Sequence, residues 1–270
     1  ESLIAQLSPR EIADIKFAQE QVRNFAQAQR DSMRDIEIET MPGVILGHKN
    51  IPVQSVGCYV PGGKFPMVAS AHMSVATASV ACVPRIIAST PPFEGRPNPA
   101  VIAAIHFGGA HEIYVLGGIQ AVGAMALGTE TITPVDMLVG PGNAFVAEAK
   151  RQVFGRVGID MIAGPSEILV MADSKNNPDH IAIDLLSQAE HDKLAQAILV
   201  TDNGIFADNV MRSIDKYLNV LERKKIAKSS WNNFGAVIIC ENLLKSVDLV
   251  NKLAPEHLEI AVDNPDKFLK

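Results

Sequence analysis

The sequence predicts an α/β fold made of two Rossmann-like domains with largely parallel sheets, one inserted in the other. Short apolar runs alternate with helical patterns along the 270 residues, and this alternation is typical of parallel βαβ units. The runs number about ten, which is many for one open sheet and favours two domains. From the glycine-rich segments at 61–63 and 164–165, we expect residues 1–58 and 168–270 to form one domain and residues 59–167 to form the inserted one.

The N-terminal segment predicts a helix over residues 8–33. Ser8 and Glu11 form a capping box, Pro9 suits the first helical turn, and apolar residues recur at helical spacing after it. Further helices are expected over 67–82, 100–108, 119–127, 144–153, 178–191, 206–222 and 243–253. Strands are expected over 44–48, 53–60, 85–89, 112–116, 137–139, 168–172, 197–201, 236–240 and 258–262. The proline-rich residues 90–99 predict an irregular loop.

Composition excludes several classes of protein. With 47% hydrophobic and 20% charged residues, the chain is typical of a well-packed globular protein. A net charge of −6, with a single basic cluster at Arg223–Lys225, argues against nucleic acid as a partner. The sequence has no apolar run of membrane-spanning length and no signal pattern, so we expect a cytoplasmic protein without a membrane partner. Cys58, Cys82 and Cys240 lack CxxC spacing and predict three buried thiols in a reducing compartment.

Three glycine-rich turns follow predicted strands, at Tyr59–Gly63, Gly117–Gln120 and Gly140–Asn143. In a parallel sheet such turns lie at the carboxyl edge, where each leads into a helix whose N–H groups can hold an anion. None of the three matches the GxGxxG pattern, and each one alone is explained by ordinary backbone geometry. Their presence in one predicted domain leaves a nucleotide site and plain turns equally open.

Two polar groupings are candidates for chemistry. Asp184, Gln188 and His191 share one face of the helix over 178–191, where they could bind a metal or form ordinary polar surface. Glu256 and His257 stand at the start of a strand, where they could activate water and move a proton or be a loop carboxylate and a surface imidazole.

The remaining histidines are weaker candidates. His48, His106, His111 and His180 lie at the ends of elements and are expected to face solvent. His72 follows the first glycine-rich turn, so it can reach a ligand, but a core or capping role is favoured.

Six motifs, in order and at matching spacing, resemble those of the histidinol dehydrogenase family. They are Tyr59–Gly63, Gly117–Ala121, Val139–Val146, Ala163–Glu167, Ser187–His191 and Ala254–Leu258. The resemblance implies an enzyme that oxidises a primary alcohol, L-histidinol, to the carboxylate of L-histidine through an aldehyde in two NAD-dependent hydride transfers. It also implies one zinc ion (Zn²⁺) per site and an intertwined homodimer whose sites are completed by the partner chain.

The resemblance also implies a role for individual residues. Glu256 would activate water and His257 would act as acid and base, while Gln188 and His191 would bind zinc. The contacts implied for NAD are Tyr59, Gln120 and Asn143, in the inserted domain. The contacts implied for the substrate are Ser166, Gln188, His191, Glu256 and His257.

The chain departs from the family pattern in two ways. It lacks an N-terminal part and the C-terminal part, which in the family supplies an Asp and a His to zinc, so we expect a fragment whose first domain is incomplete at both ends. Residues 64–74 resemble a branch that oxidises 2,3-dihydroxypropane-1-sulfonate to sulfolactate, and Lys64 and His72 suit that anion. The sequence at 164–167 is the histidinol type, so both substrates stay open. A non-catalytic, two-lobed protein that binds a small molecule is a third alternative.

Overall fold

The computed structural model describes residues 2–63 and 65–269, and it confirms the α/β class. The chain divides into two compact units, Glu1–Ala163 and Gly164–Lys270, and each is built on a parallel sheet. This division differs from the expected one, because residues 1–58 pack with the first unit and the two units follow one another along the chain. The reason is that β3 (Ser55–Tyr59) is an inner strand of the first unit's sheet.

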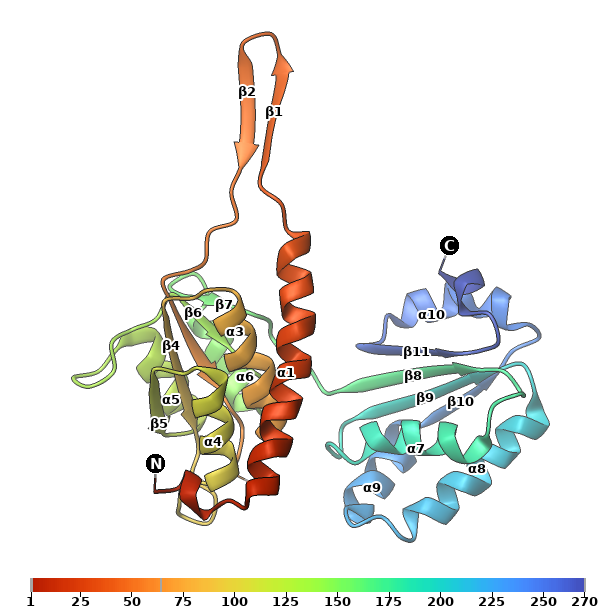
Figure 1. The fold of residues 1–270 in the computed structure, drawn as a ribbon. Coiled ribbons are helices and arrows are strands. Elements are labelled where there is room, and N and C mark those ends of the chain that lie inside the picture. Colours follow the sequence, from red (N-terminus) through yellow and green to blue (C-terminus); the bar gives the residue numbers. More distant parts are fainter. Residues whose placement is uncertain (1, 64, 270) are drawn as a thin grey trace. The chain divides into compact units, whose positions relative to one another are not determined.

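The first unit contains a five-stranded parallel sheet in the order β5-β4-β3-β6-β7 (Figure 1). Besides β3, its strands are β4 (Arg85–Thr90), β5 (Glu112–Val115), β6 (Met137–Val139) and β7 (Gly158–Ile159). Strands β4 and β5 are added in turn on one side of β3. The chain then crosses to the other side of β3, where it adds β6 and β7. This is the Rossmann order, in which the switch point lies between β3 and β6. The carboxyl ends of these two strands therefore flank the place where such sheets bind ligands.

Helices cover both faces of this sheet. They are α1 (Pro9–Ser32), α2 (Val68–Ala71), α3 (Thr77–Val80), α4 (Pro99–Gly108), α5 (Gly118–Leu127) and α6 (Ala144–Val153). Alternate residues of β3 separate the two cores, since Val56 and Cys58 pack with α1 and α4 whereas Tyr59 packs with α5 and α6. The capping box of α1 is confirmed, with the N–H of Glu11 donating to Ser8 Oγ at 3.2 Å and the N–H of Ser8 donating to Glu11 Oε2 at 2.8 Å.

The predicted helix over 67–82 is interrupted. Between α2 and α3, a π-helical turn extends over His72–Ala76. His72 is 6% exposed, and its Nδ1 atom has no hydrogen-bond partner among the described residues. This burial fits the core role favoured for His72. The four histidines expected to face solvent are exposed.

Two elements of the first unit were missed by the sequence-based prediction. They are β1 (Ile36–Met41) and β7. The predicted strand β2 (Val44–His48) is confirmed and pairs antiparallel with β1, and this hairpin extends away from the rest of the unit (Figure 1). The strand β1 is exposed on both faces, so it lacks the alternation of buried and exposed residues by which strands are recognised.

The second unit contains a four-stranded parallel sheet in the order β10-β9-β8-β11. Its strands are β8 (Glu167–Ala172), β9 (Gln196–Thr201), β10 (Ala236–Ile239) and β11 (His257–Ala261). Its helices are α7 (Pro178–Ala189), α8 (Gly204–Leu218), α9 (Lys224–Phe234) and α10 (Val247–Leu253), with short 3₁₀ turns at η3 (Leu243–Ser246) and η4 (Pro265–Phe268), and η1 (Ile4–Gln6) precedes α1. Figure 1 shows α7, α8 and α9 on one face of the sheet and α10 on the other. The helix α9 was missed by the prediction.

Composition predicts the absence of a membrane span and the burial of the three cysteines. No helix within residues 2–63 and 65–269 combines the length and the apolar character that crossing a membrane requires. The expectation of three buried thiols is wrong: Cys58 is buried, Cys240 is half-buried and Cys82 is exposed. Cys82 lies just past α3 with a φ of +59°, in a turn that points away from the core.

Candidate active site

The three residues predicted to contact NAD lie at the carboxyl edge of the first unit's sheet. Tyr59 ends β3 and is 6% exposed, and its hydroxyl oxygen accepts the N–H of Gly118 at 3.0 Å. Gly118 is the first residue of α5, whose N-cap residue Gly117 has no side chain to supply a cap. The Tyr59 hydroxyl therefore takes over the capping role and joins two of the glycine-rich turns. Gln120 is exposed on the first turn of α5.

The third glycine-rich turn reaches the switch point itself. Gly140 has a φ of +113°, and a Cβ atom there would lie 2.1 Å from the carbonyl oxygen of Tyr59. Only glycine fits such a position, because a side chain would be strained and would clash with the backbone of β3. Asn143 then begins α6, where its Oδ1 accepts the N–H groups of Phe145 and Val146 at 3.1 Å each. The side-chain nitrogen of Asn143 takes no part in these two hydrogen bonds.

The sequence-based prediction missed an ion pair beneath this turn. Lys150 on α6 is 3% exposed and forms an ion pair with Asp160, which follows β7. The ammonium group also donates to the carbonyl oxygen of Gly140 at 3.0 Å, and Asp160 Oδ2 accepts the N–H of Gly140 at 2.8 Å. A signal was available, because Lys150 stands four residues after the buried Val146 on the core-facing side of the predicted helix.

The predicted catalytic pair, Glu256 and His257, lies at the amino edge of the second unit's sheet, whereas the predicted NAD contacts lie at the carboxyl edge of the first. Glu256 Oε2 accepts the N–H of Glu167 at 3.2 Å, and His257 Nδ1 lies 3.0 Å from the carbonyl oxygen of Glu167. That carbonyl can only accept, so Nδ1 carries the hydrogen and Nε2 is the basic nitrogen. Glu256 Oε2 is 3.7 Å from His257 Nδ1, and both side chains are exposed to solvent. Ser166, one residue before β8, is half-buried at the same edge.

The helix α7 brings the predicted metal donors to this edge. The helix runs back along β8 and β9, so its carboxyl end lies near the start of the strands. Gln188 is in its last turn and 8% exposed, whereas His191 follows the helix and is exposed. Asp184, one turn earlier, is half-buried.

Two carboxyl groups link α7 to β11. Burial raises the pKa of Asp184, and the nearby His180 partly opposes that shift. Burial also raises the pKa of Glu259, and the charge of Asp184 raises it further. Glu259 shares one side of β11 with His257, because alternate strand residues point the same way. The face of α7 that carries Asp184 and Gln188 is therefore turned toward the side of β11 that carries His257.

The residues present fit only part of a zinc site. Within residues 2–63 and 65–269, no three His, Cys, Asp or Glu side chains are grouped so that they could hold a metal ion. Gln188 and His191 are two donors from one helix end, whereas zinc in proteins usually has four ligands. Asp184 does not complete the set. Lys64, which the substrate prediction uses, lies outside the described residues.

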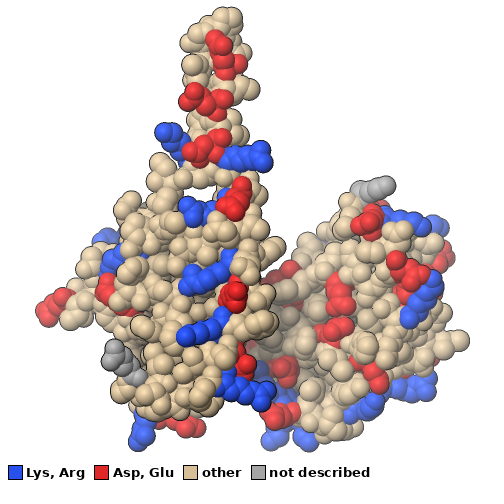
Figure 2. Space-filling model, viewed as in Figure 1, with Lys and Arg blue, Asp and Glu red and all other residues tan. Residues whose placement is uncertain are grey.

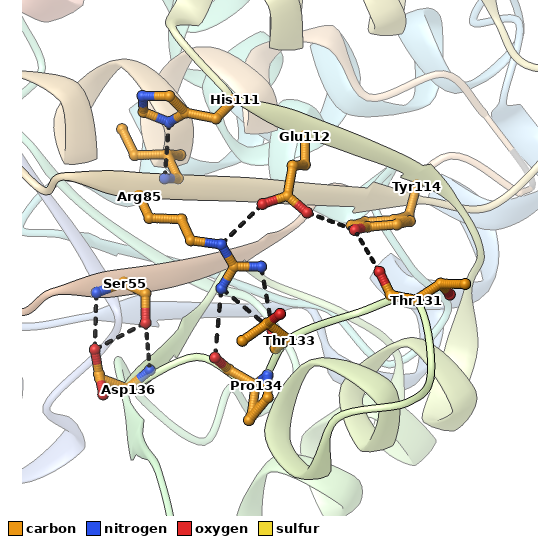
Figure 3. Close-up of polar contacts among 10 residues, drawn as sticks. Ser55, Arg85, His111, Glu112, Tyr114, Thr131, Thr133, Pro134 and Asp136 are labelled. Carbon is orange, nitrogen blue, oxygen red and sulfur yellow. Dashed lines mark hydrogen bonds and ion pairs between the residues drawn. The ribbon is translucent and has the colours of Figure 1, made fainter.

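A polar network occupies the amino edge of the first unit's sheet (Figure 3). Arg85 Nε donates to Glu112 Oε1 at 2.8 Å, and Tyr114 Oη donates to Glu112 Oε2 at 2.5 Å. These two hydrogen bonds, from Arg85 first and from Tyr114 second, lower the pKa of Glu112. Asp136 Oδ2 accepts both the N–H and the hydroxyl of Ser55 at 2.8 Å. Because these side chains bind one another, they hold the strand ends together and are not a ligand site.

Two cavities lie away from the predicted residues. One of about 380 Å³ lies between α1 and the π-helical turn, lined mainly by apolar side chains such as Val22, Phe25 and Met73. Another of about 300 Å³ lies at the carboxyl edge of the second unit's sheet, beside Asp173, Asp202 and Phe268. Neither contains a residue that the motifs single out.

Known proteins resemble the whole described chain. Residues 1–270 match the family model of histidinol dehydrogenase. A histidinol dehydrogenase homolog from Shouchella clausii is 53% identical over 269 residues, which are 100% of this chain and 63% of that protein. Histidinol dehydrogenase 1 from Nostoc sp. is 54% identical over 253 residues, which are 94% of this chain and 58% of that protein.

A solved structure shows the same similarity. The crystal structure of histidinol dehydrogenase from Elizabethkingia anophelis matches with a TM-score of 0.93 at 37% identity, over 99% of this chain and 62% of that one. The chain thus spans less than two thirds of the length of these relatives. Because the family model matches it from end to end, the chain belongs to the histidinol dehydrogenase family.

Proposed function

We propose that the full protein that carries this chain is a zinc- and NAD-dependent dehydrogenase that oxidises a primary alcohol to a carboxylate. The reaction passes through an aldehyde in two hydride transfers, of the L-histidinol to L-histidine type. The observation that carries this proposal is the pairing of His257, whose Nε2 is free to take a proton, with the adjacent carboxylate of Glu256. A cytoplasmic location goes with it, which the three free thiols support.

His257 is the base for the hydroxyl proton in both hydride transfers. Its Nδ1–H is held by the carbonyl of Glu167, which orients the ring and leaves Nε2 to accept. Glu256 polarises the water that adds to the aldehyde between the two transfers. Its carboxylate is anchored by the N–H of Glu167, so the backbone of one residue of β8 orients both side chains.

Zinc, held in part by Gln188 and His191, would supply a Lewis acid for the alcohol oxygen. The remaining donors would come from parts of the protein that correspond to the unspanned length of the relatives. Ser166 would contact the substrate beside them. NAD, when bound at the first unit, supplies the hydride acceptor. The carboxyl-edge turns with Tyr59, Gln120 and Asn143 support this placement, since they flank the switch point of a Rossmann-type sheet.

The alternative substrate is 2,3-dihydroxypropane-1-sulfonate, which the segment around Lys64 and His72 favours by resemblance. Burial lowers the pKa of His72, so the imidazole is held neutral and offers a hydrogen bond and no positive charge. This weakens the case for His72 as the partner of a sulfonate.

The test is formation of NADH by the full protein with L-histidinol and with the sulfonated diol, side by side. We expect turnover of L-histidinol. Turnover of the diol alone would replace the substrate, and turnover of neither, with tight binding of one, would favour the non-catalytic binding protein.

We also propose a homodimer, and the hairpin of the first unit supports it. Its exposed large apolar side chains are Ile36, Ile38, Met41, Val44, Ile45 and Leu46. A two-stranded hairpin is marginal in water by itself, and exposed apolar patches of this kind mark interfaces. Acidic side chains lie along the hairpin, and both basic and acidic side chains lie at its base (Figure 2).

Light scattering tests this assembly. Ile38→Asp should shift the full protein from dimer toward monomer, because it places a charge in the apolar face. Ile205→Asp, at an exposed position of α8, is the matched control and should leave the mass unchanged. A dimer that survives Ile38→Asp would place the interface elsewhere.

A further inference from the structure

We propose that Lys150 and Asp160 are a positioning pair that holds the Gly140–Asn143 turn in the shape that receives the nucleotide cofactor. This inference rests on the proposed NAD site, and it assigns the site a part that does not touch the cofactor. The sequence-based prediction did not include either residue.

Both backbone polar groups of Gly140 are held by this one ion pair. The ammonium group of Lys150 donates to the carbonyl oxygen of Gly140 at 3.0 Å, and Asp160 Oδ2 accepts its N–H at 2.8 Å. Asp160 Oδ1 bonds with Lys150 and also accepts the N–H of Met161 at 2.7 Å. Each charged group therefore binds its partner and one backbone polar group of the same residue, Gly140.

Gly140 needs such support because of where it lies. The strand β6 ends at Val139, so within residues 2–63 and 65–269 no neighbouring strand satisfies the N–H and C=O of Gly140. Its φ of +113° lies in a region that glycine enters readily but need not occupy, so contacts from other residues must select it. The turn also passes close to β3, because a Cβ atom at Gly140 would lie 2.1 Å from the carbonyl oxygen of Tyr59. The pair therefore holds the backbone of Gly140 in place. Because Asn143 and the first turn of α6 follow within a few residues, their position at the switch point depends on this contact.

Stability alone does not explain a buried ion pair in this place. Removing the Lys150 ammonium group and part of the Asp160 carboxylate from water costs about as much as their attraction returns, so an apolar pair of similar volume is often equally stable. Lys150 is 3% exposed, which makes this cost large. An apolar pair, however, could not hold the N–H and C=O of Gly140. Stability and positioning can thus be separated by experiment.

The decisive variant is the double substitution Lys150→Met with Asp160→Leu, which removes both charges and leaves neither unpaired. The single variant Asp160→Leu leaves the buried ammonium group of Lys150 without its partner, whereas Lys150→Met leaves the partly exposed carboxylate of Asp160. The double variant avoids both unpaired charges and keeps the test valid. Asp160→Asn is the conservative variant, because its amide oxygen still accepts from Gly140. Arg151→Met is the matched control: Arg151 is the next residue on α6 and forms an exposed ion pair with Glu148.

We expect the double variant to melt near the wild-type temperature but to bind NAD about tenfold or more weakly, because two charge-assisted hydrogen bonds to the turn are lost. The kcat at saturating NAD should change little, so the loss should appear in KM for NAD. The amide of Gly140 should exchange its hydrogen faster than in the wild type. Asp160→Asn should restore much of the affinity, and Arg151→Met should behave as wild type.

Two results separate the failure of this inference from failure of the proposed function. If the wild type binds NAD and the double variant binds it equally well, the positioning role is wrong and the NAD site stands. If the wild type binds no NAD, the proposed function fails, and exchange at Gly140 alone decides whether the pair orders the turn. Wild-type exchange in the double variant would overturn the inference in either case.

Discussion

The two units have similar sheets but carry their candidate sites at opposite edges. In the first unit, the carboxyl edge has the glycine-rich turns with Tyr59 and Asn143, while polar side chains at the amino edge bind one another. In the second unit, the amino edge has Glu256 and His257, while side chains and backbone groups at the carboxyl edge bind one another. There the N–H of Asp263 donates to Asp173 Oδ2 at 3.0 Å.

The fold of each unit by itself does not locate the site. Both sheets place their first strand inside, with a switch point on one side of it, so the usual rule predicts a ligand at each carboxyl edge. The edges differ in whether their polar side chains bind one another. Where they do, the hydrogen bonds hold the strand ends in place. Where side chains are oriented by the backbone and keep a free donor or acceptor atom, they can bind a ligand and react.

The largest effect is expected at the amino edge of the second unit. His257→Asn should slow both hydride transfers by about 10²–10⁴, because Asn cannot take the hydroxyl proton. Glu256→Gln should leave the first transfer largely intact and slow the conversion of supplied aldehyde. Single-turnover formation of NADH from alcohol and from aldehyde measures the two steps. Equal losses in both steps for Glu256→Gln would mean that the pair acts as one coupled acid–base unit.

The next effect concerns the metal at the same edge. His191→Ala should remove most of the bound zinc from the full protein, because an amide oxygen such as that of Gln188 is a weak zinc ligand without the imidazole. Elemental analysis of purified protein measures this loss. His180→Ala, an exposed histidine near the start of α7, is the control and should retain the metal. Full retention of zinc in His191→Ala would place the metal elsewhere.

An edge that only holds strands should affect stability and leave cofactor binding unchanged. Arg85→Met should lower the free energy of unfolding by about 1–2 kcal/mol, since it removes charge-assisted hydrogen bonds that are partly screened by solvent. Urea denaturation measures the loss, and KM for NAD should stay the same. Glu112 has a lowered pKa in the folded protein, so this contribution is present above its unfolded pKa and fades as the pH falls through the folded value. A raised KM would contradict the contrast between the edges.

A smaller effect is expected from His72, which lies inside the first unit and at neither edge. Burial lowers its pKa, so its neutral form stabilises the fold above the unfolded pKa of about 6.5. Stability should decline as the pH falls from about 6.5 toward the lower, folded pKa. His72→Leu should flatten this part of the curve of melting temperature against pH. An unchanged curve would mean that other groups dominate the acid response.

The smallest effect is expected at the carboxyl edge of the second unit. Lys175 forms an exposed ion pair with Asp263, and such pairs contribute little because solvent screens them. Lys175→Met should change the free energy of unfolding by less than about 0.5 kcal/mol and leave activity unchanged. A marked loss of activity would show that this edge, with its adjacent cavity, also binds a ligand.

Local pattern determined most of the elements of this protein and the residues of its candidate site. Helix α1 begins where its capping box does, and the apolar runs became strands, because these signals act within a few residues. The motifs brought together Glu256 and His257, and the turn with Asn143, since each is contiguous in the chain.

The tertiary structure decided what depends on distant partners. Strand β1 is defined by its pairing with β2. Helix α9 is held by the packing of Ala227 and Trp231 in the core of the second unit. The assignment of residues 1–58 to the first unit followed from the place of β3 inside the sheet. Two sets of hydrogen bonds likewise join separate segments. One links Gly118 to the hydroxyl of Tyr59, and the other links Lys150 and Asp160 to the backbone of Gly140. Such contacts arise only when the sheet aligns its strand ends, and no local periodicity encodes that alignment.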